Sequence, residues 1–195
     1  MQKLSADGVN WNWSNTWAQP NQDGYFSMRA DEAGTYRLRI ETNGRTDIAT
    51  TFTNSFTINS ADLPTFNQNF GQIMLAAPSI KIKVRVNGES VDRNWIGVEV
   101  RKNGQWIDWL NTGPNGIGVA NLTSAGTYEF IVNPPGDGSI TGVARKIYNV
   151  VATSNGSAIS ASVTGVTADT DGSYILNFGS PTLSGTVLET STATT

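Results

Sequence analysis

The best candidate for a metal site in this sequence is the stretch Asp169-Thr170-Asp171-Gly172, which holds two aspartates at alternate positions. Alternating carboxylates before a glycine look like half of a calcium loop, and Ca²⁺ takes about six to eight oxygen ligands. No further acidic residue follows at the spacing that such a loop requires. We therefore interpret Asp169 and Asp171 as part of a solvated turn, and we expect no metal and no other cofactor.

The sequence contains no histidine and no cysteine. Histidine is the commonest general base and transition-metal ligand, and cysteine supplies thiol nucleophiles, disulfides and zinc-thiolate sites. No serine with a plausible base and no glycosidase-like pair of carboxylates can be argued, because the acidic pair Asp31-Glu32 stands in a turn beside Ala33-Gly34. We therefore expect that the protein is not an enzyme.

Tryptophans are the remaining candidates for a binding role, at Trp11, Trp13, Trp17, Trp95, Trp106 and Trp109. Exposed tryptophan rings stack on sugar rings, which makes Trp95 and Trp106 the candidate stacking residues of a glycan-binding module. The alternative is packing in the core and between domains, which the matching positions of Trp17 and Trp109 favour. Trp11 and Trp13 are candidate anchors between domains or between chains.

The charge balance is mild, with 16 acidic and 13 basic residues and a net charge of −3. No basic stripe is present for nucleic acid, and no apolar run approaches the roughly 20 residues of a membrane-spanning helix. No signal peptide is visible, so an exported chain would be a fragment or a processed product. Few lysines and many Thr, Ser, Asn and Gly are typical of exported β-proteins, and we expect an extracellular or cell-surface location.

The elements that position these residues are predicted to be β-strands. Apolar and charged residues alternate strictly from Ile80 to Val86, which predicts a strand with one buried and one wet face. Similar patterns predict strands at residues 36–41, 98–101, 128–132 and 174–178. Turn signals separate them, among them Asn-Gly at 43–44, 87–88 and 103–104, the Pro- and Gly-rich segment 134–138, and Asp171-Gly172. No helical period is sustained, so we predict an all-β sandwich or barrel.

An internal repeat runs through this pattern. Ala33-Gly34-Thr35-Tyr36 recurs as Ala125-Gly126-Thr127-Tyr128, an offset of 92 residues. The same offset, without a gap, pairs Trp17 with Trp109 and several further apolar and glycine positions. So many matches are unlike a chance similarity and indicate two copies of one repeat.

A second match has a different offset, because Pro78-Ser79-Ile80 resembles Pro181-Thr182-Leu183, 103 residues later. The difference implies about 11 extra residues in the second copy, most easily in the polar stretch 154–171. One complete copy then spans residues 78–182, and the other is split, with residues 1–77 completed by residues 183–195. The two offsets add up to the 195 residues of the chain, so the cut is expected to fall inside one loop with nothing lost.

A split copy leaves a sheet edge that needs its first strand. That strand is the C-terminal segment 183–189, and its candidate assembly residues are Leu183, Gly185, Val187 and Glu189. It would complete the sandwich within the same chain, as in a circular permutant, or on the next chain, as a donated strand. The alternative is that the two ends of the chain merely fall between repeats.

The order of short motifs within a repeat resembles a known family. Ser184-Gly185-Thr186-Val187 ends a first strand, Gly97 to Val100 form the next, Asn115-Gly116 make a turn, and Gly126-Thr127-Tyr128 open a later strand. This order is similar to that of carboxypeptidase-regulatory-like and collagen-adhesin B-type domains, which are prealbumin-like sandwiches. The resemblance implies two tandem Ig-like or prealbumin-like antiparallel β-sandwiches of seven strands each, a kind often found in tandem on bacterial surface proteins.

The functional prediction follows from the repeat and the resemblance together. We expect a structural repeat unit of an extracellular bacterial surface protein, either an adhesin stalk or a filament, joined head-to-tail by strand complementation. Its partners would be further copies of itself or neighbouring repeats, with no nucleic acid and no membrane span. The alternative is a β-sandwich module that binds a glycan or a host surface protein.

Overall fold

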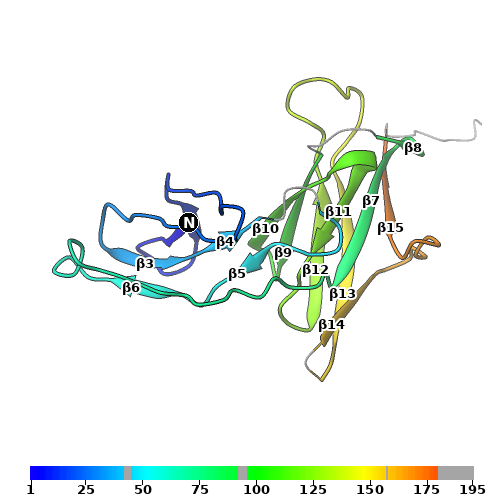
Figure 1. Ribbon diagram of the computed structural model, residues 1–195. Coiled ribbons are helices and arrows are strands. Elements are labelled where there is room, and N and C mark those ends of the chain that lie inside the picture. Colours follow the sequence, from blue (N-terminus) through cyan, green and yellow to red (C-terminus); the bar gives the residue numbers. More distant parts are fainter. Residues whose placement is uncertain (42–44, 92–95, 157, 180–195) are drawn as a thin grey trace, which may run out of the picture.

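The computed structural model describes residues 1–41, 45–91, 96–156 and 158–179 of the chain. Within these ranges the regular structure is β apart from one short 3₁₀ turn, Pro114–Gly116, so the prediction of an all-β protein is confirmed. Figure 1 shows two groups of strands beside each other. Strands β1 to β6 are called the N-terminal unit below, and strands β7 to β15 the C-terminal unit.

The C-terminal unit contains two sheets. The larger is antiparallel with the order β10-β9-β12-β13-β14, which span Gln105–Asn111, Gly97–Lys102, Gly126–Val132, Lys146–Asn155 and Ala158–Val163. The smaller has the order β11-β7-β15, which span Ile117–Ala120, Ile80–Val86 and Tyr174–Phe178. The short strand β8 (Glu89–Ser90) pairs with the end of β7. Strands β7 and β15 run parallel, whereas β11 is antiparallel to β7.

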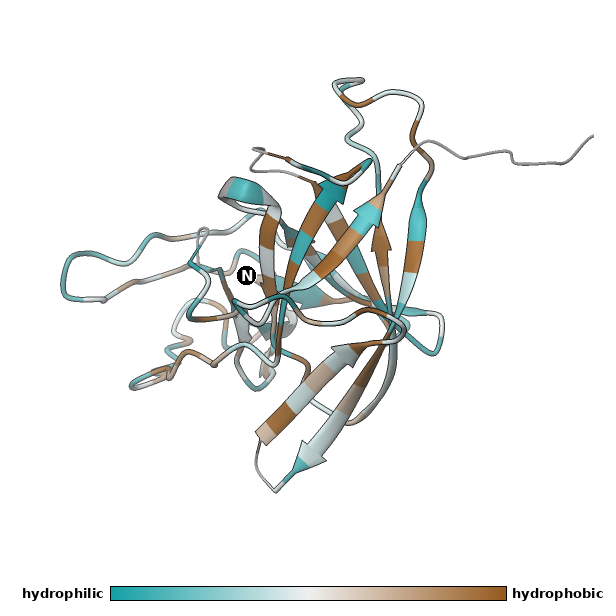
Figure 2. Cartoon of the chain, turned by 90° about the vertical axis from the view of Figure 1, so that its right-hand side faces the viewer, coloured by the Kyte–Doolittle hydropathy of each residue, from teal (hydrophilic) through white to brown (hydrophobic). Residues whose placement is uncertain are grey.

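Alternating apolar residues build the core between these two sheets. On β7, Ile80, Ile82 and Val84 are buried, while Lys81 and Lys83 face the other way. The three belong to one cluster of nineteen buried apolar side chains that draws on both sheets. Figure 2 shows the same alternation as brown and teal bands along the strands. Burying one large apolar side chain stabilises a fold by about 1.5–3 kcal/mol, so this cluster holds the two sheets together.

The N-terminal unit has a much smaller apolar core than the C-terminal unit. Its main sheet has the order β2-β1-β3-β6, which span Trp11–Trp13, Gln2–Leu4, Gly34–Arg37 and Phe56–Ile58. A separate pair is formed by β4 (Arg39–Ile40) and β5 (Thr51–Phe52). Only Met1, Tyr36, Leu38 and Ile58 are buried in its apolar cluster, and most of the partly buried residues that pack against them lie outside the strands.

Two of the predicted Asn-Gly turns have the geometry of tight hairpins. The φ angles are 52° and 76° at Asn103 and Gly104, and 51° and 85° at Asn87 and Gly88. Positive φ at both central residues matches the twist of the flanking strands. These turns join β9 to β10 and β7 to β8. The third predicted turn, at residues 43–44, lies outside the described residues.

The predicted strand at residues 36–41 is instead two short strands, and the prediction is wrong in this respect. Leu38 lies between β3 and β4, where its N–H donates to Thr53 Oγ1 at 2.9 Å and its carbonyl accepts from the Thr53 N–H at 3.1 Å. A threonine side chain thus takes the place of a ladder partner, so the chain passes from pairing with β6 to pairing with β5.

Candidate assembly surface

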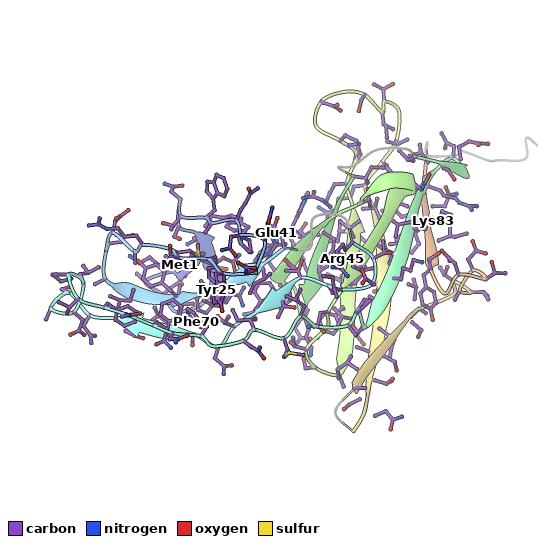
Figure 3. All side chains as sticks on the ribbon, viewed as in Figure 1. Met1, Tyr25, Glu41, Arg45, Phe70 and Lys83 are labelled. Atoms are coloured by element: carbon purple, nitrogen blue, oxygen red, sulfur yellow. The ribbon has the colours of Figure 1, made fainter. Side chains whose placement is uncertain are left out.

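An open hollow lies over one face of the N-terminal sheet. Its volume is about 940 Å³, and it is lined by Met1, Leu38 and Ile58 and by loop residues within 24–30 and 63–72. Figure 3 labels Met1, Tyr25 and Phe70, which all lie in this part of the molecule and line the hollow. Ligand pockets in proteins measure roughly 300–1,000 Å³, so this hollow has room for an extended segment of chain.

Aromatic side chains cover the hollow only in part. Phe56 of β6 packs against Phe66 and Phe70 from the loop, with ring centroids 6.1 and 5.2 Å apart. Of the other aromatic residues in the lining, Tyr25 is 76% exposed and Phe26 is 37% exposed. A concave surface with aromatic groups open to water is typical of a binding site rather than of a finished core.

The sheet beneath the hollow has the same cross-strand geometry as the large sheet of the C-terminal unit. Lys3 is the Cα partner of Tyr36 between β1 and β3, and Lys102 is the partner of Tyr128 between β9 and β12. Each tyrosine hydroxyl donates to the main-chain carbonyl four residues earlier, at 2.8 and 2.9 Å. Each lysine ammonium lies over its tyrosine ring, 5.8 and 4.8 Å from the centroid.

The glycine two residues before each tyrosine makes room for that lysine. A Cβ on Gly34 would overlap Cε of Lys3, and a Cβ on Gly126 would lie 3.0 Å from Cε of Lys102. The Gly-Thr-Tyr motif therefore has a structural cause, because the lysine stem crosses the strand where a side chain would otherwise stand. The motif was visible in the sequence, whereas its lysine partners were not.

The strand register also shows over which residues the sequence match at an offset of 92 holds. The partners Lys3 and Lys102 lie 99 residues apart, so the gapless match that holds at Tyr36 and Tyr128 does not extend to β1. By this register Met1 stands at the position of Val100 on β9, whereas the offset of 92 alone would place it at the position of residue 93.

The corresponding face of the C-terminal unit is covered. Val100 and Phe130 stand at the positions of Met1 and Leu38, and they share a buried cluster with Ile82 and Val84 of β7. Strand β7 itself lies between β11 and β15. In the N-terminal unit, the residues that correspond to β11 at the offset of 92 are 25–28, and they line the hollow without belonging to a strand.

Arg39 joins the two units. Its guanidinium donates to Asp108 Oδ1 and to the Trp109 carbonyl of β10, both at 3.0 Å, and it also bonds Glu41. The side chains of Arg39 and Asp108 are only 8% and 13% exposed. Burial raises the pKa of Asp108, and the charge of Arg39 opposes that rise. The Trp13 ring lies 5.3 Å from the Arg39 guanidinium, so Trp13 stands beside the contact between the units.

Arg37 occupies an aromatic stack next to this contact. Its guanidinium lies 4.5 Å from the Trp11 ring and 4.2 Å from the Phe52 ring, and its Nε donates to Gln2 Oε1 at 2.9 Å. Burial lowers the pKa of Arg37 to about 10, which leaves the group charged at neutral pH. Trp11 is therefore held against the N-terminal sheet by a cation–π contact.

Trp17 and Trp109 are not in the core, and the expectation of core packing for this pair is wrong. Trp17 is 76% exposed in a segment after β2 that belongs to no strand. Trp109 is 38% exposed on β10, where its ring lies across the main chain of Gly97. Because β10 is an edge strand, one side of that ring stays open to water. Trp106 on the same strand is also 38% exposed.

The aspartates of the calcium-like stretch bond to groups of their own turn and, in the case of Asp171, to β7. Asp171 accepts from Ser173 Oγ at 2.5 Å and from Lys81 Nζ at 3.1 Å, and Asp169 accepts from the Thr170 N–H at 2.8 Å. The Ser173 hydroxyl, assisted by Lys81, holds the pKa of Asp171 well below its usual range. This turn has a structural use for both carboxylates.

Several predicted site residues fall outside the described ranges: Trp95, Leu183, Gly185, Val187 and Glu189. Sequence reasoning missed Arg37, Arg39 and Asp108. Arg37 and Arg39 occupy alternate positions of a predicted strand, on the face expected to be exposed to solvent. An arginine there is usually solvated, so the sequence pattern offers no reason to expect a buried contact. Only their position beside Trp11 and Trp13 distinguishes them.

Comparison with models of protein families, with curated proteins and with solved structures gives no match for this chain. Among the residues that the structure describes, no group of three or more His, Cys, Asp or Glu side chains could hold a metal ion. No helix in those ranges has the length and apolar character to cross a membrane.

Proposed function

We propose that this protein is a structural repeat unit of an extracellular bacterial surface protein, a stalk or a filament, and that its two units are copies of one prealbumin-like sandwich. The observation that carries the proposal is the Lys–Tyr pair present in both units, with the same cross-strand partners and the same tyrosine hydroxyl bond. It occurs within the same strand order, β2-β1-β3-β6 and β10-β9-β12-β13. A duplicated unit accounts for this coincidence of order, register and side chains.

The strands of the C-terminal unit support the resemblance to prealbumin-like sandwiches. Seven main strands remain once the short β8 and the outer β14 are set aside, which is the number that the resemblance implies. Strand β14 falls within residues 154–171, where extra residues in the second copy were expected. The composition of the chain, rich in Thr, Ser, Asn and Gly, supports the extracellular location.

A mechanical role agrees with the position of the first and last strands. β7 and β15 are parallel neighbours with five paired positions, from Tyr174 with Ile82 to Phe178 with Val86. A force that pulls the start of β7 away from the end of β15 loads all of these hydrogen bonds in shear at the same time. An unzipping geometry would load them one after another. A stalk or filament under tension benefits from shear.

Single-molecule stretching of the intact chain tests the proposal. We expect a distinct high-force unfolding event for the C-terminal unit, which Leu176→Ala on β15 weakens, because forced unfolding depends on the unfolding rate. Ile159→Ala on the outer strand β14 is the matched control and should leave that force nearly unchanged. A C-terminal unit that unfolds at the low force of an unzipping hairpin would overturn the mechanical role.

A glycan-binding module is the second candidate, and the exposed tryptophans favour it. Trp13 and Trp17 are 59% and 76% exposed. Tryptophan rings in such positions stack on sugar rings. Titration with oligosaccharides, followed by tryptophan fluorescence, separates the two functions. A saturable change that Trp17→Ala abolishes supports binding, and an unchanged spectrum with every oligosaccharide leaves the structural role.

A further inference from the structure

We propose that the hollow of the N-terminal unit receives residues 183–189 of a second copy of this chain, so that the protein polymerises head-to-tail by donating a strand. This inference rests on the proposed structural function and deepens it, because it names the partner and the contact. The occupant is one defined segment, and four features of the chain support it.

The first feature is the match between the segment and β7. At the offset of 103, Leu183 corresponds to Ile80, Gly185 to Ile82 and Val187 to Val84. These β7 residues are the buried ones that cover the face of the large sheet in the C-terminal unit. The inward-facing positions of the segment are therefore apolar, as on β7, except that Gly185 replaces an isoleucine. This is the pattern of the strand that the N-terminal unit lacks.

The second feature is the surface that would receive it. Met1 and Leu38 on the floor of the hollow stand where Val100 and Phe130 meet β7 in the C-terminal unit. Residues 25–28 on one wall correspond to β11, the antiparallel partner of β7. The hollow is therefore the place in the N-terminal unit where a strand equivalent to β7 would lie.

The third feature is a second segment in the lining of the hollow. Asn69-Phe70-Gly71 repeats Asn177-Phe178-Gly179, the end of β15, and β15 is the parallel partner of β7. Phe66 and Phe70 line the hollow without belonging to a strand. Segments that match both partners of the missing strand thus line the hollow outside any strand, and the inserted segment would turn them into the outer strands of a second sheet.

The fourth feature is the length of the linker before Leu183. It decides whether the segment enters the hollow of its own chain or that of another copy. The chain enters β7 from the N-terminal unit at Ile80, and Phe178 pairs with Val86 at the opposite end of that strand. Figure 1 shows β15 on the side of the C-terminal unit away from the N-terminal unit. Returning along β7 alone takes about 20 Å for six residue steps. The five steps from Phe178 to Leu183 span at most about 18 Å.

The linker from Phe178 to Leu183 is therefore too short to bring Leu183 back to the hollow of its own chain. We therefore assign the segment to the hollow of a second copy. Because the contact does not close on itself, it produces a linear polymer.

Engineered disulfides test the contact in a chain that has no cysteine of its own. In the C-terminal unit Val119 is the Cα partner of Lys81, which places Ser27 opposite Ser184 at the two offsets. The intact double variant Ser27→Cys/Ser184→Cys is oxidised and run on a non-reducing gel. We expect a ladder of covalent oligomers that collapses on reduction.

The matched control is Ser27→Cys/Gly185→Cys, whose second cysteine points to the other face of the strand and should give no ladder. An internally closed monomer in the first variant would show that the chain completes itself and would overturn the proposal. An absence of any disulfide in both variants would also overturn it. Neither result touches the stretching behaviour of the C-terminal unit, so the proposed function is judged separately.

Light scattering gives a second, independent measurement. The intact chain should grow in mass with concentration, and Val187→Asp should abolish that growth by placing a carboxylate inside the hollow. Thr186→Asp adds the same charge on the outward face and should polymerise nearly as well as the unmodified chain. Equal masses for the two variants would overturn the assignment of residues 183–189 to the hollow.

Discussion

Gly116 meets two constraints at once. Its φ is 70°, a conformation that side chains rarely adopt, and a Cβ would lie 2.5 Å from the carbonyl oxygen of Val84 on β7. Gly116→Ala should therefore lower the free energy of unfolding by about 2–4 kcal/mol, the sum of backbone strain and overpacking.

Gly104 provides the matched comparison. Its φ is 76°, but a Cβ there meets nothing within 4 Å. Gly104→Ala should cost only about 1 kcal/mol in urea unfolding, because backbone strain alone remains. Equal losses for the two variants would show that the close approach of Gly116 to β7 does not contribute.

Asp171 gives a pH dependence at the residue scale. Its pKa lies below the unfolded value of about 3.9, mainly because the Ser173 hydroxyl donates to the carboxylate. A group with a lowered folded pKa adds stability above its unfolded pKa and loses it as the pH falls toward the folded one. The difference in unfolding midpoint between the unmodified chain and Asp171→Asn should therefore shrink progressively below about pH 4.

Ser173→Ala is the control for the cause of this effect. It removes the largest source of the lowered pKa and leaves the main-chain N–H of residue 173 and Lys81 in place, so it should weaken the pH dependence without abolishing it. A Ser173→Ala chain with the full acid sensitivity of the unmodified protein would assign the effect to the main-chain N–H of residue 173 and Lys81 instead.

The contact between β4 and β10 is the main prediction at the element scale. Arg39 and Asp108 are almost fully buried, and breaking a buried ion pair from one side leaves an uncompensated charge. Arg39→Met alone, which leaves the Asp108 carboxylate buried without its cation, should therefore destabilise the protein by about 3–5 kcal/mol. The double variant Arg39→Met/Asp108→Leu should recover a large part of that loss, because no buried charge is left behind.

A double-mutant cycle by urea unfolding measures this coupling. Coupling between residues in contact is typically about 0.5–3 kcal/mol, whereas independent sites add to within about 0.5 kcal/mol. Additive losses would mean that the two units are not joined through this pair.

Strands and turns were predictable because their causes are local. The alternation from Ile80 to Val86 and the Asn-Gly pairs at 87–88 and 103–104 depend only on neighbouring residues, and each is found where it was expected. The break at Leu38 was not predictable, because it depends on a hydroxyl fifteen residues away at Thr53.

The surface contacts were harder to predict than the core. Trp17 and Trp109 match at the offset of 92, which indicated core packing. Trp17 lies in a loop and Trp109 on an edge strand, however, where no further strand among the described residues covers the ring. The hollow is a further example. Much of its lining comes from residues 24–30 and 63–72, which have no clear strand pattern, and only the fold brings them to the same face of the sheet.

The two units differ in how well they are filled, and this difference belongs to the whole molecule. The C-terminal cluster contains nineteen buried apolar side chains among the described residues, and the N-terminal cluster contains four. Each large buried side chain adds about 1.5–3 kcal/mol, so the N-terminal unit should be far less stable on its own. We therefore expect two thermal transitions, with the N-terminal unit unfolding first.

A peptide of residues 181–191 should raise only the lower transition. The Val187→Asp chain is the suitable host, because its own segment cannot enter the hollow of a neighbour. A ligand that binds the folded state alone stabilises it by RT ln(1 + [L]/Kd), about 2.7 kcal/mol at a concentration of 100 Kd. Calorimetry across a range of peptide concentrations should therefore show the lower Tm rising while the upper Tm stays constant.

The same peptide with Val187→Asp is the control and should shift neither transition, since its inward face now carries a charge. A rise in both transitions would indicate nonspecific binding. A constant lower Tm at every concentration would show that the N-terminal unit does not accept this strand. A selective rise would connect the small N-terminal core to assembly, because the unit would reach its full stability only when a second molecule supplies the missing layer.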